Sequence, residues 1–489
     1  MSAGLFCGMA CQLTNEPLLR NPGKEMTFFL PHTATRRRLL AASGCGFGSL
    51  ALNTLLADES QSANPFAVRP GHHSARAKRV IFLYMPGGPS HVDLFDPKPR
   101  LEKDNGKPLP FEKPRLERTK TGNLLASPFR FRQHGQSGTP VSELLPNVAS
   151  CIDDICVIRS MLADNINHTG AALQMCTGEQ AFSRPSLGSW LTYGLGTETQ
   201  NLPGFIVVSP AAVFQGAQLW ASSFLPSAYQ GTLVRDLKNP IANMNTDSGQ
   251  LARQRIKLDA LAQFNSTHRQ QREIDSILDA RMASFELAFR MQKEAPAAFD
   301  VSQESAATQK LYGIDDPVTD MFGRQCLMAR RLVERGVRFI HLFDAPANNA
   351  WDHHGGLREN LPARCRAVDQ PIAALLTDLK NHGLLDDTLV LWGGEFGRTP
   401  TAEGTNGREH HPFGFTMWMA GGGIRGGMVH GATDEFGWNS VQDVVHVHDL
   451  HATILHLMGF DHTKLTYRYG GRDYRLTDVH GEVVQNILA

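Results

Sequence analysis

The chain has 489 residues, and its 48 basic side chains balance its 48 acidic ones, so the net charge is zero. A nucleic-acid-binding protein usually shows a basic patch or a high pI, so this balance argues against a nucleic-acid partner. A hydrophobic share of 42% excludes disorder over the whole length. The length is enough for about three average domains, although α/β enzymes are often longer as one unit.

The N-terminal 57 residues have the pattern of an export signal. The basic run Arg36–Arg38 precedes a short apolar stretch rich in small residues, which is typical of a secretory signal. Paired arginines and a weakly hydrophobic run favour the twin-arginine route. We therefore expect residues 1–57 to be a twin-arginine signal, with Met26 as a candidate true start. The alternative is a chance basic run before a buried helix.

This signal predicts a partner and a location. The chain would use the twin-arginine export machinery and reach the periplasm or the extracellular space. No later segment has the roughly 20 apolar residues of a membrane span, so we expect no transmembrane anchor in the mature form.

The rest of the chain predicts one domain. Residues 58–77 are polar and are interpreted as a linker, and residues 78–489 as an α/β domain. Apolar runs predict strands at 79–85, 154–160, 205–208, 337–343, 388–392 and 415–419. Helices are expected at 169–175, 371–381 and 449–458, and a helical insertion at about 246–295. Strands that alternate with helices predict a doubly wound, mostly parallel sheet with helices on both faces.

Four loops that follow predicted strands carry side chains of the metal-ligand type. In open α/β sheets, ligands bind just beyond the carboxyl ends of strands. Taken singly, a histidine near a strand is more often a hydrogen-bonded structural residue, and an aspartate often caps a turn. The convergence of four such loops favours a site. The candidates are His91 and Asp93, then His168 and Thr169, then Asp352 and His354, and finally Glu395, Arg398, His410 and His411.

These residue types point to metal-assisted chemistry. Carboxylate and imidazole ligands suit Zn²⁺ and Mn²⁺, and carboxylates alone suit Ca²⁺ or Mg²⁺. A divalent ion lowers the pKa of a water or alcohol nucleophile and neutralises an anionic substrate. Arg398 is suited to hold a phosphate or sulfate with two hydrogen bonds. The helix that starts near Thr169 offers free N–H groups to the same anion.

Several segments resemble the alkaline phosphatase and sulfatase superfamily. The run GLLDDTLVLWGGEFG at 383–397 is similar to the pattern that precedes a metal-binding Asp–His pair, and DLHATILHLMGF at 449–460 to a late helix. The runs NHTGAALQMCTG at 167–178 and DHHGG at 352–356 resemble the nucleophile helix and a metal motif. The whole mature chain more closely resembles a large bacterial family of exported proteins with a domain of unknown function, often labelled sulfatase-like. Its phrases GGPSHVDLFDPKP and GGGIRGGMVHGATDEFG carry this resemblance.

The resemblance implies roles for particular residues. It assigns the first-strand metal position to Asp93 or His91 and the middle metal motif to Asp352 and His354. It assigns the later carboxylate to Glu395. The late histidine position falls on His411, with His410 as the alternate.

Two departures from the superfamily bear on the chemistry. Phe396 stands where the superfamily has the histidine of the Asp–His pair, which argues against a full two-metal phosphatase site. His168 occupies the position of the cysteine that matures to formylglycine, and no CxPSR motif exists. Thr169 is the nearest hydroxyl and the candidate nucleophile, with His168 and Arg398 as further candidate catalytic residues. Ser90 and Ser186 are weaker options.

Two hypotheses follow. The first is an exported, metal-dependent hydrolase of phosphate or sulfate esters, with an anionic small molecule or polysaccharide as substrate and Zn, Mn, Ca or Mg as cofactor. The second is a non-catalytic binding or assembly protein on the same scaffold, which Phe396 and the missing nucleophile motif favour. A serine hydrolase is disfavoured because no GxSxG motif is present.

Overall fold

The N-terminal part of the described chain runs along the surface of the domain. The computed structural model describes residues 64–113, 120–238, 240, 248–270 and 276–489. The predicted signal at 1–57 and residues 58–63 of the predicted linker lie outside this range. From residue 64 the linker segment lies against the domain, because Phe66 is buried and the backbone N–H of Arg69 donates to the carbonyl of Leu195 at 2.9 Å.

A nine-stranded sheet runs through the described part of the chain, in the order β12-β4-β11-β8-β1-β7-β5-β6 with β15 also beside β4. β11 is antiparallel to both of its neighbours, and the other pairs are parallel. This confirms the predicted mostly parallel α/β sheet. Its strands are β1 Arg79–Tyr84, β4 Ile155–Leu162, β5 Phe205–Val208, β6 Thr232–Val234, β7 Phe339–Phe343, β8 Thr388–Gly393, β11 Phe415–Ala420, β12 Met428–His430 and β15 Val445–His446.

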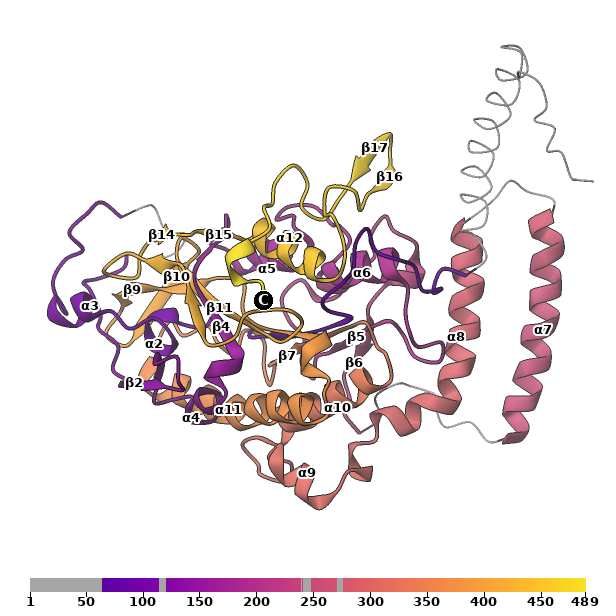
Figure 1. The fold of residues 1–489 in the computed structure, drawn as a ribbon, viewed down its shortest axis with the longest axis horizontal. Helices are drawn as coiled ribbons and strands as arrows, with labels where there is room; N and C mark the ends of the chain where they lie inside the picture. The colour runs from indigo at the N-terminus through magenta and orange to yellow at the C-terminus, as the bar shows by residue number, and fades with distance from the viewer. Residues whose placement is uncertain (1–63, 114–119, 239, 241–247, 271–275) are drawn as a thin grey trace, which may run out of the picture. The chain divides into compact units, whose positions relative to one another are not determined.

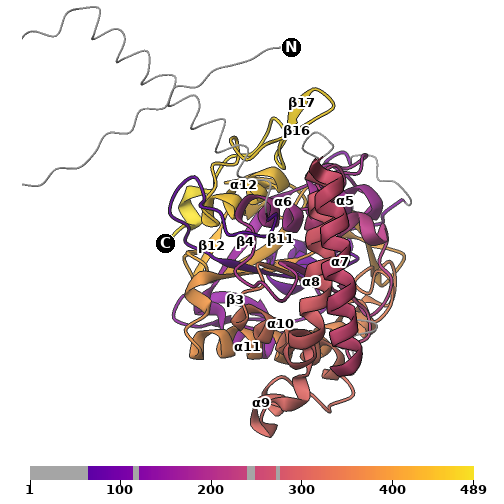
Figure 2. The ribbon, with the colours of Figure 1, turned by 90° about the vertical axis from the view of Figure 1, so that its right-hand side faces the viewer.

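Helices cover both faces of the sheet, as Figures 1 and 2 show. Side chains alternate along each strand, so Val80 and Phe82 of β1 belong to one apolar core and Ile81 and Leu83 to the other. The first core lies under α5 His168–Thr177, α6 Leu187–Leu195 and α12 Val447–Leu457. The second lies under α10 Asp320–Glu334 and α11 Leu357–Asn381. The doubly wound arrangement is therefore confirmed.

The predicted helical insertion forms two helices, α7 Ser248–Gln270 and α8 Ser276–Phe299, which lie side by side in Figure 2. The C-terminal turns of α8 anchor the pair, because Ala295, Ala298 and Phe299 are buried in the same core as α10. Within the described residues, no helix is long and apolar enough to cross a membrane.

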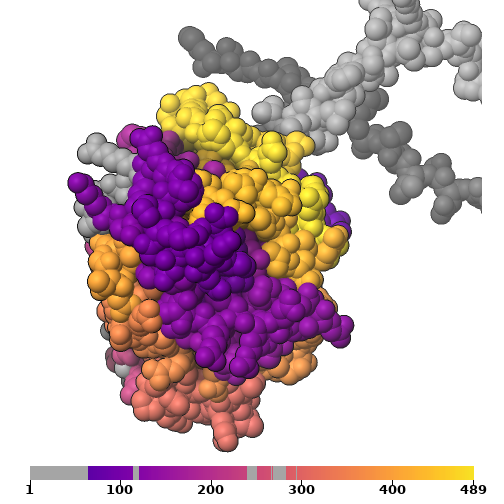
Figure 3. Space-filling model, turned by 90° about the vertical axis from the view of Figure 1, so that its left-hand side faces the viewer, coloured from indigo at the N-terminus to yellow at the C-terminus, as the bar shows by residue number. Residues whose placement is uncertain are grey.

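Smaller elements complete the domain. The segment between β1 and β4 covers much of the face shown in Figure 3. The short helices are α2 His91–Leu94, α3 Pro99–Lys103, α4 Pro146–Ser150 and α9 Ala306–Leu311. The two-stranded pairs are β2 Phe131–His134 with β3 Thr139–Ser142, β9 Gly397–Glu403 with β10 Gly407–His411, β13 Ala432–Thr433 with β14 Ser440–Gln442, and β16 Tyr467–Tyr469 with β17 Arg472–Tyr474.

Two elements differ from the sequence expectation. α11 begins at Leu357 rather than at residue 371, and both Pro362 and Pro371 lie inside it. Proline favours the first turn of a helix, which made residue 371 look like a start, but burial of the preceding turns outweighs that preference. The stretch expected to be a loop after Glu395 instead forms the β9–β10 hairpin, in which His410 pairs with Arg398.

Trp392 lies at the centre of an aromatic cluster in the second core. Its ring stacks on Trp418 at 6.0 Å and meets Phe95 at 5.4 Å. We expect Trp392→Ala to lower the free energy of unfolding by about 3–5 kcal/mol, because a large buried side chain leaves a cavity. Urea denaturation measures this loss. The exposed control Val441→Ala should change stability by less than about 0.5 kcal/mol, and a similar loss in both variants would contradict the assigned core.

Candidate metal centre

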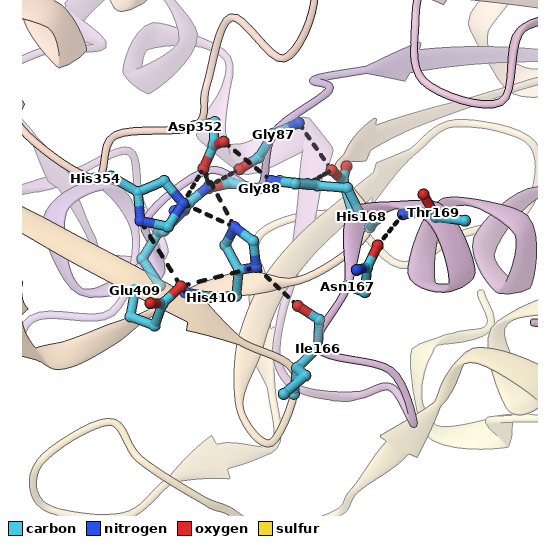
Figure 4. A network of polar contacts seen from close by, with 12 residues as sticks. Gly87, Gly88, Ile166, Asn167, His168, Thr169, Asp352, His354, Glu409 and His410 are labelled. Carbon is cyan, nitrogen blue, oxygen red and sulfur yellow. Dashed lines mark hydrogen bonds and ion pairs between the residues drawn. The ribbon is translucent and has the colours of Figure 1, made fainter. Parts of the chain in front are cut away.

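The predicted site residues gather at the carboxyl edge of the sheet. The chain leaves β1 into Gly87 and Gly88, β8 into Glu395, and β7 into the loop that carries Asp352. The segment after β4 leads into α5 at His168. Ligands bind at this edge in open α/β sheets, and the polar contacts drawn in Figure 4 lie there.

Four of these side chains form one compact group. His168, Asp352, His354 and His410 each offer one ligand atom, and these atoms lie within 4.8 Å of one another. The carboxylate of Asp352 lies 3.1 Å from Nε2 of His168, 3.0 Å from Nε2 of His354 and 3.4 Å from Nε2 of His410. The Nε2 atoms of His354 and His410 lie 3.0 Å apart.

The three imidazoles are oriented by oxygen acceptors on their other nitrogen. A backbone carbonyl or an ionised carboxylate only accepts, so each Nδ1 carries the proton and each neutral ring keeps a lone pair on Nε2. An outer acceptor that fixes a ring in this way is the usual partner of a metal-binding histidine. The pairs are His168 with Glu395 at 2.6 Å, His410 with the carbonyl of Ile166 at 2.8 Å, and His354 with Glu403.

The converging lone pairs need a cation among them. The Nε2 atoms of His354 and His410 lie 3.0 Å apart, so two lone pairs there would repel each other unless a proton or a metal ion lies between them, and the nearby carboxylate of Asp352 adds negative charge. A tetrahedral zinc site has bonds near 2.0–2.1 Å, so neighbouring ligand atoms lie about 3.3 Å apart. The four separations given above, 3.0 to 3.4 Å, are close to this spacing. The donor set therefore fits a divalent transition-metal ion.

The electrostatics of the group favour bound positive charge. Burial alone would raise the pKa of Asp352, but hydrogen bonds from the three imidazoles, in the state where their Nε2 atoms carry protons, and the charge of Arg398 lower it well below its usual range. The pKa of His354 is raised by the hydrogen bond that its imidazolium donates to Asp352 and by a second one to Glu403. The pKa of His168 is also raised, because its carboxylate partners outweigh burial. The carboxylates thus attract protons or a metal ion to the same place.

Glu395, predicted as a metal ligand, lies behind His168 instead. Its carboxylate accepts from the backbone N–H of Gly87 at 2.9 Å and from the hydroxyl of Tyr84 at 3.0 Å. With His168 as a third partner, Glu395 orients a ligand rather than joining the group of four. A carboxylate can either bind a metal ion directly or accept a proton from a metal-binding histidine, so the presence of Glu395 in the sequence is compatible with both positions.

Arg398, predicted to hold a substrate anion, is surrounded by protein oxygens. Its guanidinium donates to the carbonyls of Gly87, Gly88 and Arg408 and to Asp352. The residue is 0% exposed. In this arrangement it ties the hairpin to the loop after β1 and does not face the open side of the group.

The remaining predicted ligands lie apart from the group of four. Asp93 forms a fully buried pair with Arg408, at 2.7 Å from Nε and 3.0 Å from the second guanidinium nitrogen. His91 and His411 bond through Nε2 to the carbonyls of Gly437 and Trp438. The structure does not bring Asp93, His91 and His411 to the ion that the other four side chains would hold.

His168 and Thr169, predicted as catalytic residues, point in different directions. His168 faces Asp352, whereas the side chain of Thr169 lies outside the group and is directed away from it (Figure 4). The backbone N–H of Thr169 donates to the cap residue Asn167. The nucleophilic role of Thr169 stays a prediction that this geometry does not favour.

The group is buried on one side and partly open on the other. His168 and His410 are 5% and 2% exposed, whereas the side chains of Asp352 and His354 are 19% and 27% exposed. The ring of Phe214, itself 45% exposed, stacks on His168 at 6.0 Å. A small molecule would therefore approach past Asp352, His354 and Phe214.

The sequence pattern did not single out Glu403, Glu409 or Tyr84. Glu403 and Glu409 form a second potential ligand group with His354, and Glu403 serves here as the acceptor of its Nδ1 proton. Glu403 borders the turn of the hairpin, where a charged residue resembles an ordinary surface residue. Tyr84 is the last residue of an apolar strand, and only its contact with Glu395 reveals its role.

Fold and site together define an α/β protein with a histidine-rich group of metal-ligand type at the carboxyl edge of its sheet. The chain belongs to the family DUF1501, described as a protein of unknown function, whose model matches residues 77–488.

Solved structures show weaker similarity. The alkaline phosphatase from the Antarctic bacterium TAB5 has 10% identity and a TM-score of 0.33, and the alignment covers 78% of this chain and 98% of that one. The PsFucS1 sulfatase from Pseudoalteromonas sp. has 12% identity and a TM-score of 0.32, with 85% and 72% covered. No curated protein matches the chain. Similarity at this level says nothing about the activity of this chain.

The buried pair of Asp93 and Arg408 generates a prediction that separates structure from metal binding. We expect Asp93→Asn to lower the free energy of unfolding by about 3–5 kcal/mol, because it leaves the guanidinium of Arg408 without its charged partner. The metal content of the folded variant should equal that of the wild type. Chemical denaturation and metal analysis measure the two quantities. Loss of the ion without loss of stability would instead assign Asp93 to the metal centre.

Proposed function

We propose that this chain is a metal-dependent hydrolase of phosphate or sulfate esters, with a divalent ion held by His168, Asp352, His354 and His410. The convergence of three Nε2 atoms on one carboxylate, each ring fixed through Nδ1, supports the ion. Three nitrogens and one carboxylate suit Zn²⁺ and similar transition metals, whereas Ca²⁺ and Mg²⁺ prefer oxygen ligands. Of the candidate metals, zinc and manganese therefore fit best.

The partly exposed side of the group supports a catalytic role. When bound, a divalent ion supplies Lewis acidity and lowers the pKa of a coordinated water. His168 and His410 hold fixed orientations through Glu395 and the carbonyl of Ile166, so the group needs little rearrangement. The exposed ring of Phe214 offers an apolar surface to the organic part of an ester. Because Thr169 is directed away, water is the proposed nucleophile.

The substrate class and the place of action rest on further reasoning. A divalent ion at the open side attracts an anionic group, so the proposed substrate is an anionic small molecule or a polysaccharide that carries phosphate or sulfate esters. The proposed export by the twin-arginine route, and a periplasmic or extracellular location, rest on the N-terminal motif alone.

A second candidate function has its own support. Structural zinc sites usually have four protein ligands, whereas catalytic sites keep one position open. The group offers four ligands, and the guanidinium of Arg398 is engaged by protein oxygens. The ion would then stabilise a non-catalytic binding or assembly protein. Metal content and turnover, measured on the same sample, separate the two candidates.

His410 and His411 are neighbours on β10, but only His410 belongs to the proposed ligand group, so the two alanine variants form a matched pair. Purified protein should hold about one divalent ion per chain, and His410→Ala should reduce this below about 0.2, because three ligands bind more weakly than four. His411→Ala should keep the ion. Elemental analysis by mass spectrometry measures the content, and circular dichroism checks that both variants fold.

The ligand assignment fails if the wild type holds less than about 0.2 ion per chain. It also fails if His411→Ala loses the ion as completely as His410→Ala does.

Turnover of chromogenic esters tests the hydrolase and its nucleophile. We expect His354→Ala to lower kcat/KM for 4-nitrophenyl phosphate or 4-nitrophenyl sulfate by at least about 100-fold, because the ligand at the open side is lost. Thr169→Val should stay within about 3-fold of the wild type, because water replaces a side-chain nucleophile.

Inactivation by Thr169→Val in a folded, metal-loaded protein would restore Thr169 as the nucleophile. Metal-loaded wild type without turnover of either ester would favour the second candidate function.

A further inference from the structure

One loop supplies two of the four side chains of the group. Residues 344–356 connect β7 to α11, and this loop carries both Asp352 and His354. Its middle, residues 346–348, is exposed to solvent. Surface loops are the more mobile parts of a protein, so two ligands on such a loop hold a fixed place only where the loop is fastened to the domain.

Trp351 anchors the end of the loop that bears the ligands. It is 0% exposed, and its backbone N–H donates to the carbonyl of Pro86 at 3.0 Å. Gly87 lies against the same point, since a Cβ there would come within 2.5 Å of the backbone nitrogen of Asp352. Because Asp352 follows Trp351 directly, a shift of the indole would move the carboxylate at the centre of the group.

A hydrogen bond between two side chains closes the base of the loop. The indole N–H of Trp351 donates to Oδ2 of Asp344 at 2.8 Å. Asp344 is itself held at the end of β7, where its backbone N–H donates to the carbonyl of Tyr84 at 3.0 Å. The bond therefore joins the two ends of the loop across its exposed middle.

Asp344 is a costly residue at this position. Its side chain is 0% exposed, and within the described chain its Oδ1 makes no hydrogen bond. The guanidinium of Arg364 lies 3.9 Å from that oxygen. A buried carboxylate with so few partners lowers stability, and a buried polar atom without a partner requires an explanation other than packing. The contact with Trp351 supplies this explanation.

We infer that Asp344 is a positioning residue of the metal centre, which acts through the indole N–H of Trp351 and so fixes Asp352 among the imidazoles. Metal sites need ligand positions accurate to about 0.5 Å, and loss of a group that orients a ligand weakens metal binding about 10- to 100-fold. Asp344 touches neither the ion nor a substrate. Its role rests on the proposed function, because it presupposes the bound ion.

The Zn²⁺ affinity of four variants tests this role. Trp351→Phe keeps an aromatic ring in the core but removes the N–H, so it should raise the dissociation constant about 10- to 100-fold, and Asp344→Ala should do the same. Asp344→Asn keeps an acceptor oxygen and should stay within about 3-fold of the wild type. The double variant Asp344→Ala with Trp351→Phe should bind no more weakly than the weaker single variant, because both remove one bond. Competition with a chelating indicator measures these constants.

A destabilised variant of α10 separates this role from a general loss of stability. Leu332 is 0% exposed and belongs to the same core as Trp351. It lies near the end of α10 that precedes β7, whereas the loop leaves the other end of that strand. Leu332→Ala should lower the midpoint of urea denaturation but keep the Zn²⁺ dissociation constant within about 3-fold of the wild type, because distant sites rarely couple.

Wild-type affinity in folded Trp351→Phe and Asp344→Ala would overturn the role of Asp344 and leave the proposed ligands intact. A loss in Asp344→Asn as large as in Asp344→Ala would overturn it as well. So would an equal loss in Leu332→Ala, because affinity would then follow stability alone. A wild type that binds no ion would overturn the proposed function, and the role of Asp344 with it.

Discussion

The carboxylate of Asp352 is the contact on which the arrangement of the site depends. It contacts three imidazoles that come from the start of α5, from its own loop and from β10, and it accepts from Arg398 on β9. Segments far apart in the chain thus meet at one negative group. A buried carboxylate is stable only when cationic partners or hydrogen-bond donors surround it. Arg398 and the imidazoles are these partners of Asp352, and a metal ion among the Nε2 atoms would add a further positive charge next to it.

Two further buried groups keep this arrangement rigid. Arg398 joins the β9–β10 hairpin to the glycines after β1, and the pair of Asp93 and Arg408 fastens the same hairpin to α2. Glu395 holds His168 from behind while Tyr84 and Gly87 hold Glu395. The four side chains of the group are thus positioned by a second layer of contacts, as ligand groups in metalloproteins usually are. Phe396 offers no ligand atom, and the hairpin histidine His410 joins the group from another segment.

The two edges of the sheet have different chemistry. At the carboxyl edge, polar loops meet and charges are paired around a partly open group. At the amino end of β5, side chains from α8 and the N-terminal segment line a cavity whose lining residues carry no charge. The helical insertion contributes side chains of α8 to the wall of this cavity.

The sequence by itself determined the class of fold and the edge at which the site lies. Apolar runs such as 388–392 become strands because burial on both faces demands them, and candidate ligands at strand ends must gather at one edge of a parallel sheet. It also identified Asp352, His354 and His410 as candidate ligands. Only the tertiary structure decided that His168 joins them, that Glu395 stands behind His168, and that Asp93 pairs with Arg408. The physical reason is that residue type and spacing fix the position of a side chain along its own segment. Its partner depends on distances of a few ångströms between segments that lie hundreds of residues apart.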